Sequence, residues 1–325
     1  MSRVAVTGSS GRLGRSVVSV LNSLGNEVFC LDRLFPSGSE EATLTSSDSS
    51  HVSTVDLTNF DDTVALFADL KPDAVVHLAA IAVPFSAPEH VILRTNATLA
   101  FNVIQGAVSA GVRKIITASS PTVQGYGAPI GWIPERLPLD ESMEPNPWNA
   151  YALSKLIAER TMRMFAAQCG DSVRLAAFRP CYVIAPEEWL GALTQQGHTV
   201  RQRLDDPSLG APALFNYVDA RDVGRFIHIL IEALTEIPNA QVFYVGARDA
   251  LARKSLAELI PEYFPEAAQA ASELTGSQPA FSIEKAHRLL GWQPERTWRS
   301  ELSHEPRSAL DCSSAVPVSS LETRK

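Results

Sequence analysis

The stretch VAVTGSSGRLGRSVVSVL, residues 4–21, decides the fold of this chain of 325 residues. It opens as a short apolar strand, passes through Gly8, Gly11 and Gly14, and continues with the apolar spacing of a helix. In such a unit Gly8 permits the tight turn, Gly11 lets a pyrophosphate approach the backbone, and Gly14 lets the helix pack close on the sheet. The helix start supplies free N–H groups for phosphates. The stretch therefore predicts a dinucleotide-binding unit.

The end of the second predicted strand bears on the choice of dinucleotide. Asp32 closes EVFCLD, residues 27–32, eighteen residues after Gly14. A carboxylate at this place accepts both ribose hydroxyls of adenosine and repels a 2′-phosphate. Arg12 or Arg33 could instead meet a 2′-phosphate. We therefore expect NAD as the cofactor and keep NADP as the alternative.

Strands and helices alternate through the first half of the chain. Further strands are predicted at 52–57, 73–80, 114–120 and 173–180, and helices at 13–24, 61–70, 89–110 and 151–168. Alternation at these lengths indicates right-handed crossovers on a parallel sheet, and the continuous apolar strands indicate a sheet covered on both faces. The predicted fold class is α/β, a Rossmann-type doubly wound parallel sheet with a smaller C-terminal substrate-binding lobe.

The domain boundaries follow from where this alternation loosens. We expect an NAD(P)-binding Rossmann domain over residues 1–180 and a substrate-binding lobe, interleaved with it, over 181–299. Residues 35–50 are small and polar and predict a loop. Residues 300–325 are poor in apolar side chains, so we expect a disordered tail.

Composition narrows the class of protein. The net charge of −8 gives no reason to expect nucleic acid or an anionic membrane as partner. No secretory leader and no apolar run long enough to span a bilayer is visible, so the cytoplasm is the expected compartment. The four cysteines are scattered without metal-ligand spacing, and we expect no metal site.

A tyrosine and a lysine stand four residues apart in AYALSKLIAE, residues 150–159. On a helix Tyr151 and Lys155 share one face. A cation about 4 Å away, at an effective dielectric near 20, is worth about 4 kcal/mol. We therefore expect Lys155 to lower the pKa of Tyr151 toward neutrality, where a phenol can exchange a proton with an alcohol or a carbonyl. An incidental exposed pair is the alternative.

In combination, several motifs over residues 3–298 resemble the extended short-chain dehydrogenase/reductases, the NAD-dependent epimerase/dehydratase family. The motifs are TGSSGRLG at 7–14, HLAA at 77–80, SSPTVQG at 119–125, YALSK at 151–155 and RPCYVIAP at 179–186. The resemblance implies that Ser120 holds the substrate oxygen, Tyr151 is the acid and base, and Lys155 also binds the nicotinamide ribose.

The resemblance and the glycine loop together give a set of candidate cofactor-binding residues. They are Gly8, Gly11, Arg12, Leu13, Gly14, Asp32, Arg33, Asp56, Leu57, Leu78, Ala79, Ala80, Asn96, Lys155 and Pro180. The resemblance also suggests a homodimer formed through the helix over 89–110 and the helix that carries Tyr151.

Two departures from the family pattern bear on the substrate. Nucleotide-sugar members usually carry Asn where this chain has Tyr182, and usually carry an Arg for the diphosphate where it has Phe215 or a neighbour. An unpaired diphosphate in a partly buried site is costly. The acidic residue usual beside the serine or threonine of dehydratases is also absent, because Pro121 and Thr122 follow Ser120.

These departures favour a small alcohol, carbonyl compound or free sugar derivative as substrate. The predicted function is an NAD(P)-dependent dehydrogenase or reductase in which Tyr151 handles the proton. A sugar epimerase that retains its NAD is the first alternative, and a catalytically silent cofactor-binding regulatory protein is the second.

Overall fold

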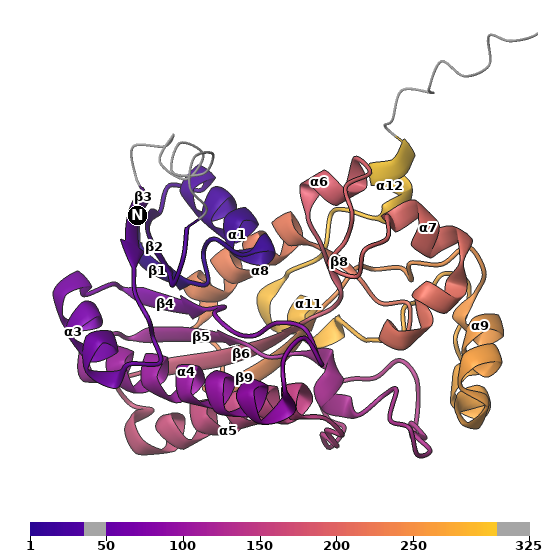
Figure 1. Cartoon of the computed structure of the whole chain (residues 1–325), viewed down its shortest axis with the longest axis horizontal. Helices are drawn as coiled ribbons and strands as arrows, with labels where there is room; N and C mark the ends of the chain where they lie inside the picture. Colours follow the sequence, from indigo (N-terminus) through magenta and orange to yellow (C-terminus); the bar gives the residue numbers. More distant parts are fainter. Residues whose placement is uncertain (36–49, 304–325) are drawn as a thin grey trace, which may run out of the picture.

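The structure is a computed structural model and describes residues 1–35 and 50–303. Its centre is a parallel sheet of seven strands in the order β3-β2-β1-β4-β5-β6-β9 (Figure 1). The sheet strands are β1 (Arg3–Thr7), β2 (Glu27–Asp32), β3 (Ser50–Thr54), β4 (Ala74–His77), β5 (Lys114–Ala118), β6 (Arg174–Pro180) and β9 (Gln241–Val245). The sheet winds outward in both directions from the β1–β4 pair, which confirms the predicted fold class.

The register of the central strands brings their carboxyl ends to one edge. Thr7, the last residue of β1, pairs with Leu31 of β2 and with His77, the last residue of β4. His77 in turn pairs with Thr117, next to the end of β5. In an open parallel sheet the ligand lies outside this edge, at the point where the winding reverses.

Helices cover both faces of the sheet (Figure 1). One face carries α3 (Phe60–Leu70), α4 (Glu89–Ser109) and α5 (Ala150–Cys169), and the other carries α1 (Arg12–Ser23), α8 (Ala220–Ala233) and α11 (Glu284–Leu290). Side chains alternate between faces along a strand. Accordingly Val4 and Val6 lie in the apolar cluster beneath α1 and α8, whereas Ala5 lies in the cluster beneath α4 and α5. Burial on both faces explains the continuous apolar strands.

The C-terminal lobe lies beside the carboxyl edge and is built from short elements. A parallel pair joins β7 (Val183–Ile184) to β8 (Val218–Asp219). The short helices of the lobe are α6 (Pro186–Trp189), α7 (Val200–Asp205), α9 (Leu256–Tyr263), α10 (Ala268–Ala271) and α12 (Trp298–Ser303), with 3-10 turns at Pro207–Leu209, Ala211–Ala213 and Pro265–Ala267. A further 3-10 turn, Pro121–Gln124, follows β5.

The chain after residue 180 returns to the main sheet. Strand β9 pairs with β6 along its whole length, with Phe178 opposite Phe243, and α8 packs on α1. Residues 181–299 thus contribute both to the lobe and to the Rossmann sheet.

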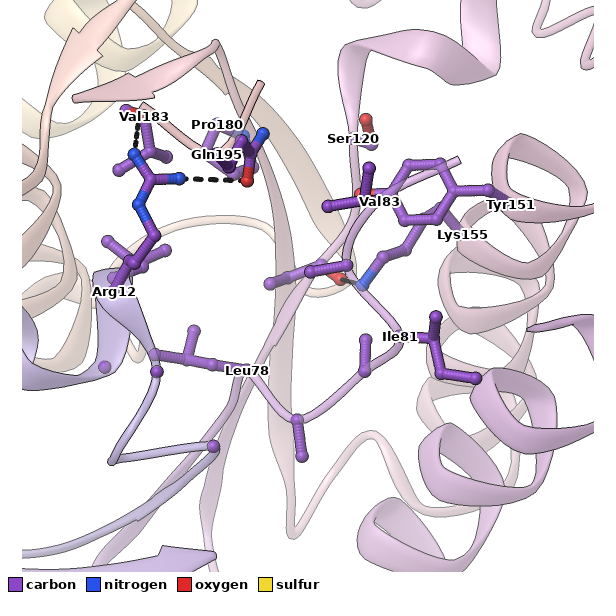
Figure 2. Close-up of a pocket in the computed structure, with 18 of the residues that line it drawn as sticks. Arg12, Leu78, Ile81, Val83, Ser120, Tyr151, Lys155, Pro180, Val183 and Gln195 are labelled. Atoms are coloured by element: carbon purple, nitrogen blue, oxygen red, sulfur yellow. Dashed lines mark hydrogen bonds between the residues drawn. The ribbon is translucent and has the colours of Figure 1, made fainter. Parts of the chain in front are cut away.

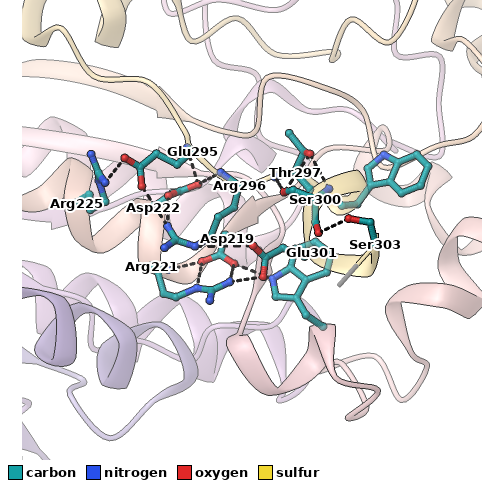
Figure 3. Close-up of polar contacts among 12 residues, drawn as sticks. Asp219, Arg221, Asp222, Arg225, Glu295, Arg296, Thr297, Ser300, Glu301 and Ser303 are labelled. Atoms are coloured by element: carbon teal, nitrogen blue, oxygen red, sulfur yellow. Dashed lines mark hydrogen bonds and ion pairs between the residues drawn. The ribbon is translucent and has the colours of Figure 1, made fainter. Parts of the chain in front are cut away.

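The predicted tail begins later than residue 300. Residues 298–303 form α12, which ionic contacts hold against the start of α8 (Figure 3). Arg221 donates to Asp219 at 2.6 Å and to Glu301 at 2.7 Å. The prediction of disorder was wrong for residues 300–303, because polar composition does not exclude a helix held by such contacts; the remainder of the predicted tail lies outside the described residues. Most of the predicted loop at 35–50 also lies outside them.

Candidate active site

A cavity of about 560 Å³ runs along the carboxyl edge of the sheet, between the sheet and the lobe. Its wall contains Ser120, Tyr151 and Lys155 and every candidate cofactor-binding residue except Asn96. Ten of the lining residues are labelled in Figure 2, which shows Arg12 and Leu78 on one side of the cavity and Tyr151 and Lys155 on the other. One continuous cavity therefore joins the glycine loop to the Ser–Tyr–Lys group.

The glycine loop is built for close approach. Gly8 has φ +71°, and a Cβ there would lie 2.7 Å from the backbone N of Ala79. A Cβ on Gly14 would lie 2.1 Å from the carbonyl oxygen of Gly8. Helix α1 begins after Gly11 without a side-chain cap. The N–H groups of its first turn therefore form part of the cavity wall without a side-chain partner, as a helix start that binds an anion requires.

Asp32 lies at the end of the cavity that the adenosine ribose would occupy. Ser10 holds one of its oxygens through its backbone N at 3.0 Å and its hydroxyl at 2.7 Å. The backbone N of Arg33 donates to the other oxygen at 2.7 Å, and the Arg33 side chain is exposed. Ser10 was missed in the sequence analysis, although its place inside the glycine loop, beside the end of β2, was a usable signal.

Arg12 is directed toward the lobe. Its guanidinium pairs with the buried carboxylate of Glu188 and donates to Gln195 Oε1 at 2.9 Å and to the carbonyl oxygen of Val183 at 3.1 Å (Figure 2). These contacts connect the start of α1 with α6 and with β7. Because three of its five N–H donors already point to partners in the lobe, Arg12 is poorly placed to hold a 2′-phosphate.

Asp56 and Leu57 also line the cavity, where Leu57 is buried and Asp56 is exposed. The backbone and hydroxyl of Thr58 donate to Asp56 and hold the pKa of that carboxyl below its usual value. Leu78, Ala79, Ala80 and Pro180 complete the part of the wall nearer the centre.

Asn96 does not line the cavity. It is buried on α4, where its Oδ1 accepts from the backbone N of Ile81 at 2.8 Å. Its Nδ2 donates to the carbonyl oxygen of Ile81 and to the hydroxyl of Ser154, both at 3.1 Å. Asn96 therefore fixes the segment after β4 to α5, and its predicted direct contact with the cofactor has no support in this geometry.

Ser120, Tyr151 and Lys155 come together from two elements. Ser120 follows β5, and its hydroxyl oxygen accepts from the Thr122 hydroxyl at 2.9 Å and from the Thr122 backbone N at 3.3 Å. With these bonds accepted, the Ser120 hydrogen is free to donate into the cavity. Tyr151 and Lys155 project from the first turns of α5, and Lys155 Nζ lies 5.8 Å from the centre of the Tyr151 ring. Lys155 also donates to the carbonyl oxygen of Ala118 at 3.0 Å.

The structure corrects the expected pKa of Tyr151. Burial raises the pKa of Tyr151 above its ordinary value, and the neighbouring Ser120 hydroxyl offsets only part of the rise. Burial likewise lowers the pKa of Lys155 to about 8. The sequence argument placed the cation beside the phenol but left out the loss of water around both groups, which disfavours their charged forms.

A buried ion pair lies directly behind the reactive group. Glu159, one turn along α5 from Lys155, accepts from Arg179 Nε at 2.8 Å and from Arg179 Nη2 at 2.9 Å. The same carboxylate accepts from the Ser119 hydroxyl at 2.6 Å. Because Ser119 precedes Ser120 in the chain, the pair fixes β5, β6 and α5 around the reactive residues. The sequence analysis missed it.

The two departures noted in the sequence differ in their placement. Tyr182 lies on the cavity wall. Phe215 is buried, and its ring centre lies 6.0 Å from the ring centre of Tyr263, so it presents no charge to a ligand.

His77 is buried in β4, where its Nδ1 lies 2.8 Å from the Thr7 hydroxyl, and burial lowers its pKa to about 3. These features give His77 a structural role in β4.

Two negative observations limit the kinds of site. Within residues 1–35 and 50–303, no cluster of three or more histidine, cysteine or acidic side chains is arranged to hold a metal ion. No helix in the same ranges has both the length and the apolar character needed to cross a membrane.

Known proteins resemble this chain over half of its length or more. A UDP-glucose 4-epimerase of Corynebacterium glutamicum is 26% identical over 316 residues, which cover 91% of this chain and 92% of that protein. A UDP-glucose 4-epimerase of Mycolicibacterium smegmatis is 31% identical over 166 residues, covering 50% of this chain and 51% of the other.

A structural relative shares the fold at lower identity. The crystal structure of UDP-glucose-4-epimerase from Stenotrophomonas maltophila, with bound NAD and formylated UDP-arabinopyranose, superposes with a TM-score of 0.70 at 17% identity. The match covers 93% of this chain and 96% of that one.

The model of the NAD dependent epimerase/dehydratase family matches residues 4–246, which include the glycine loop, Ser120, Tyr151, Lys155 and β9. The match confirms the resemblance predicted from the motifs, and with it an enzyme that uses NAD. The chain therefore belongs to the NAD-dependent epimerase/dehydratase family.

Proposed function

We propose that this protein moves a hydride between the nicotinamide of NAD and an alcohol or carbonyl carbon of a sugar-like substrate. The observation that carries the proposal is the shared cavity, which holds Ser120, Tyr151 and Lys155 at one end and the glycine loop with Asp32 at the other. A cofactor along the carboxyl edge would reach from one group to the other.

The chain's own residues have distinct tasks in this reaction. The first turn of α1 and Asp32 hold the phosphates and the adenosine ribose. The Ser120 hydroxyl, oriented by Thr122, donates to the substrate oxygen. Tyr151 gives its proton to a carbonyl oxygen in reduction and takes one from the alcohol in oxidation. When bound, the nicotinamide supplies or accepts the hydride.

Lys155 has both a positional and an electrostatic task. Its position above the Tyr151 ring and its bond to Ala118 place the ammonium between β5 and the phenol. From there it can reach a ribose hydroxyl of the nicotinamide nucleoside, and its charge would act against the burial that disfavours the phenolate form of Tyr151.

A second candidate is nucleotide-sugar 4-epimerisation, which the names of the relatives favour. It uses the same first step, followed by return of the hydride to the other face of the substrate. The apolar side chain of Phe215, at or next to the position where nucleotide-sugar members usually carry an arginine, weighs against it, because a nucleotide diphosphate requires charged or hydrogen-bonding partners. A silent cofactor-binding role is a weaker candidate, because Ser120, Tyr151 and Lys155 are all present in the cavity.

The deciding experiment measures cofactor exchange and substrate turnover on the purified protein. A dehydrogenase should release its cofactor and change absorbance at the reduced-nicotinamide band with a sugar-like alcohol or carbonyl compound. UDP and UDP-sugars should neither bind nor inhibit at millimolar concentration. Retained cofactor together with micromolar UDP-sugar binding would reject the dehydrogenase and establish the epimerase.

The proposal includes a cytoplasmic homodimer formed through α4 and α5. The exposed apolar side chains of Phe101 on α4 and of Leu153 and Met164 on α5 support it, as does the family resemblance. The ring of Trp148, just before α5, is also partly exposed and lies 5.6 Å from Phe85.

A further inference from the structure

Arg203 on α7 is a charged residue almost completely removed from solvent. Its side chain is 1% exposed, and among the described residues only Arg179 is a comparably buried arginine. A guanidinium stays protonated in proteins, so it cannot escape burial by losing its charge. Placing such a group inside a protein is costly unless an opposite charge and hydrogen bonds compensate.

The described contacts of Arg203 provide only part of that compensation. Nη1 donates to Gln196 Oε1 at 2.7 Å and lies 3.4 Å from His198 Nε2. The guanidinium carbon lies 4.0 Å from the centre of the Tyr182 ring. No carboxylate of the described chain forms an ion pair with it, and its Nε and Nη2 make no hydrogen bond there. The hydroxyl of Tyr182 is also buried and makes no hydrogen bond of normal geometry, although it lies close enough to Arg203 to favour the charged guanidinium.

Two other arginines show what this free edge is suited to bind. Arg179 presents Nε and Nη2 to the two oxygens of Glu159, at 2.8 and 2.9 Å. Arg221 presents the same two atoms to Asp219, at 2.9 and 2.6 Å. This fork matches a group with two adjacent oxygens. On Arg203 the same pair of donors has no oxygen opposite it.

The unpartnered group lies next to the candidate active site. Tyr182 and Gln196, which contact Arg203 from two sides, both line the cavity that contains Ser120 and Tyr151. Gln196 is exposed and belongs to the turn between α6 and α7, so rotation of its side chain would free Arg203 Nη1. Arg203 therefore lies directly behind two residues of the cavity wall, and its donors Nε and Nη2 remain without a hydrogen bond there.

We propose that Arg203 and Tyr182 form the site for an oxyanion on the substrate, a carboxylate or a phosphoryl group. The inference rests on the proposed function, since it places the anion on the molecule whose alcohol or carbonyl carbon Tyr151 serves. It also gives a reason for the two departures from the family pattern. The positive charge absent at Phe215 is supplied from α7, and the ring of Tyr182 stacks on it.

The test uses the full chain loaded with NAD and titrates four ligands by calorimetry. Glucuronate carries a carboxylate, glucose 6-phosphate a phosphoryl group, UDP a diphosphate, and glucose no charge. We expect at least one anion to bind and glucose to bind more weakly. Arg203→Met should lower the affinity for that anion about 10-fold or more, which is the scale expected when paired hydrogen bonds from a charged guanidinium are lost. NAD affinity should stay unchanged.

Two further variants and one control separate a ligand site from a structural role. Arg203→Met should leave the thermal midpoint of the ligand-free protein unchanged or raised, because an uncompensated buried charge is removed. Tyr182→Phe, which deletes only the hydroxyl, should lower the affinity for the anion and leave the affinity for NAD unchanged. Arg203→Lys, which keeps the charge without the fork, should bind with intermediate strength. Arg201→Met, an exposed position on the same helix, should bind like the parent.

The outcomes distinguish this inference from the proposed function. If NAD binds but no anion does, or if Arg203→Met binds anions like the parent, the inference is overturned. A lower thermal midpoint in Arg203→Met with unchanged anion binding would show a structural arginine instead. A parent protein that fails to bind NAD would reject the proposed function. Arg203-dependent binding of UDP would support the inference and favour the epimerase as the reaction.

Discussion

At the scale of single residues, the chemistry depends on how burial acts on Tyr151 and Lys155. Burial raises the pKa of the phenol and lowers that of the ammonium to about 8, so both neutral forms are favoured. At neutral pH the phenol of Tyr151 thus keeps its proton, and in the proposed reaction it would donate this proton during reduction. Oxidation needs the phenolate, whose population grows as the pH rises toward the raised pKa.

Tyr151→Phe removes only the hydroxyl that exchanges the proton. We expect turnover to fall by about 10² or more, the scale of lost general acid–base catalysis, while NAD binding survives. For the parent protein, oxidation should accelerate with rising pH, and the variant should lose that dependence. Steady-state rates across pH, with cofactor titration as a folding control, check both points. A folded variant that binds NAD and turns over at the parent rate would exclude Tyr151 as the proton carrier.

Asp32 should set the preference between cofactors. Its carboxylate is held by Ser10 at the ribose end of the cavity and repels a 2′-phosphate, so the protein should bind NAD more tightly than NADP. Asp32→Asn should weaken the binding of NAD and reduce the difference in affinity between NAD and NADP. Fluorescence titration with both reduced cofactors measures this. Tighter NADP binding by the parent would mean that Arg33 outweighs the carboxylate.

At the scale of elements, the Glu159–Arg179 pair connects α5 to β6 and, through Ser119, to β5. Glu159→Gln leaves a buried guanidinium without its charge partner, and loss of one partner of a buried pair costs about 3–5 kcal/mol. We expect a large fall in the free energy of unfolding. Arg160, on the same helix as Glu159, forms an exposed pair with Glu144 in the loop before α5, and Arg160→Gln should cost at most about 1 kcal/mol. Denaturant unfolding of both variants tests the contrast, and equal losses would contradict it.

The sequence predicted those parts of the site whose chemistry is local. The glycine loop and the spacing to Asp32 lie within one strand–helix–strand unit, and Tyr151 and Lys155 share one turn of a helix. Asn96 came from the family resemblance alone, and its contacts with Ile81 and Ser154 could not be predicted, because they are set by how α4 packs on α5, which no motif encodes. The sign of the Tyr151 pKa shift was wrong for the same reason, since burial is a tertiary property. The sequence did not single out Arg203. Its unusual feature is that Nε and Nη2 make no hydrogen bond within the described chain, and a sequence does not show such contacts.

At the scale of the whole molecule, the outer face of α4 and α5 carries the proposed dimer contact. Phe101→Glu together with Met164→Glu places charges where two copies would bury apolar surface, and uncompensated burial of charge opposes association. We expect the parent to sediment at twice the chain mass and the double variant at the chain mass. Ile130→Glu, an exposed apolar position outside both helices, should remain dimeric. A monomeric parent, or a dimeric double variant, would rule this interface out.

The pairing of β9 with β6 has a consequence for how the protein is made. Until residues 241–245 have left the ribosome, β6 is an open edge, and an unpaired edge strand is a template for association with other chains. The nucleotide-binding half is synthesised first. Its sheet nevertheless lacks its last strand, β9, until about three quarters of the chain has emerged. A nascent chain stalled shortly after residue 180 would therefore present its apolar β6 edge to chaperones, whereas one stalled well beyond α8 and β9 would not.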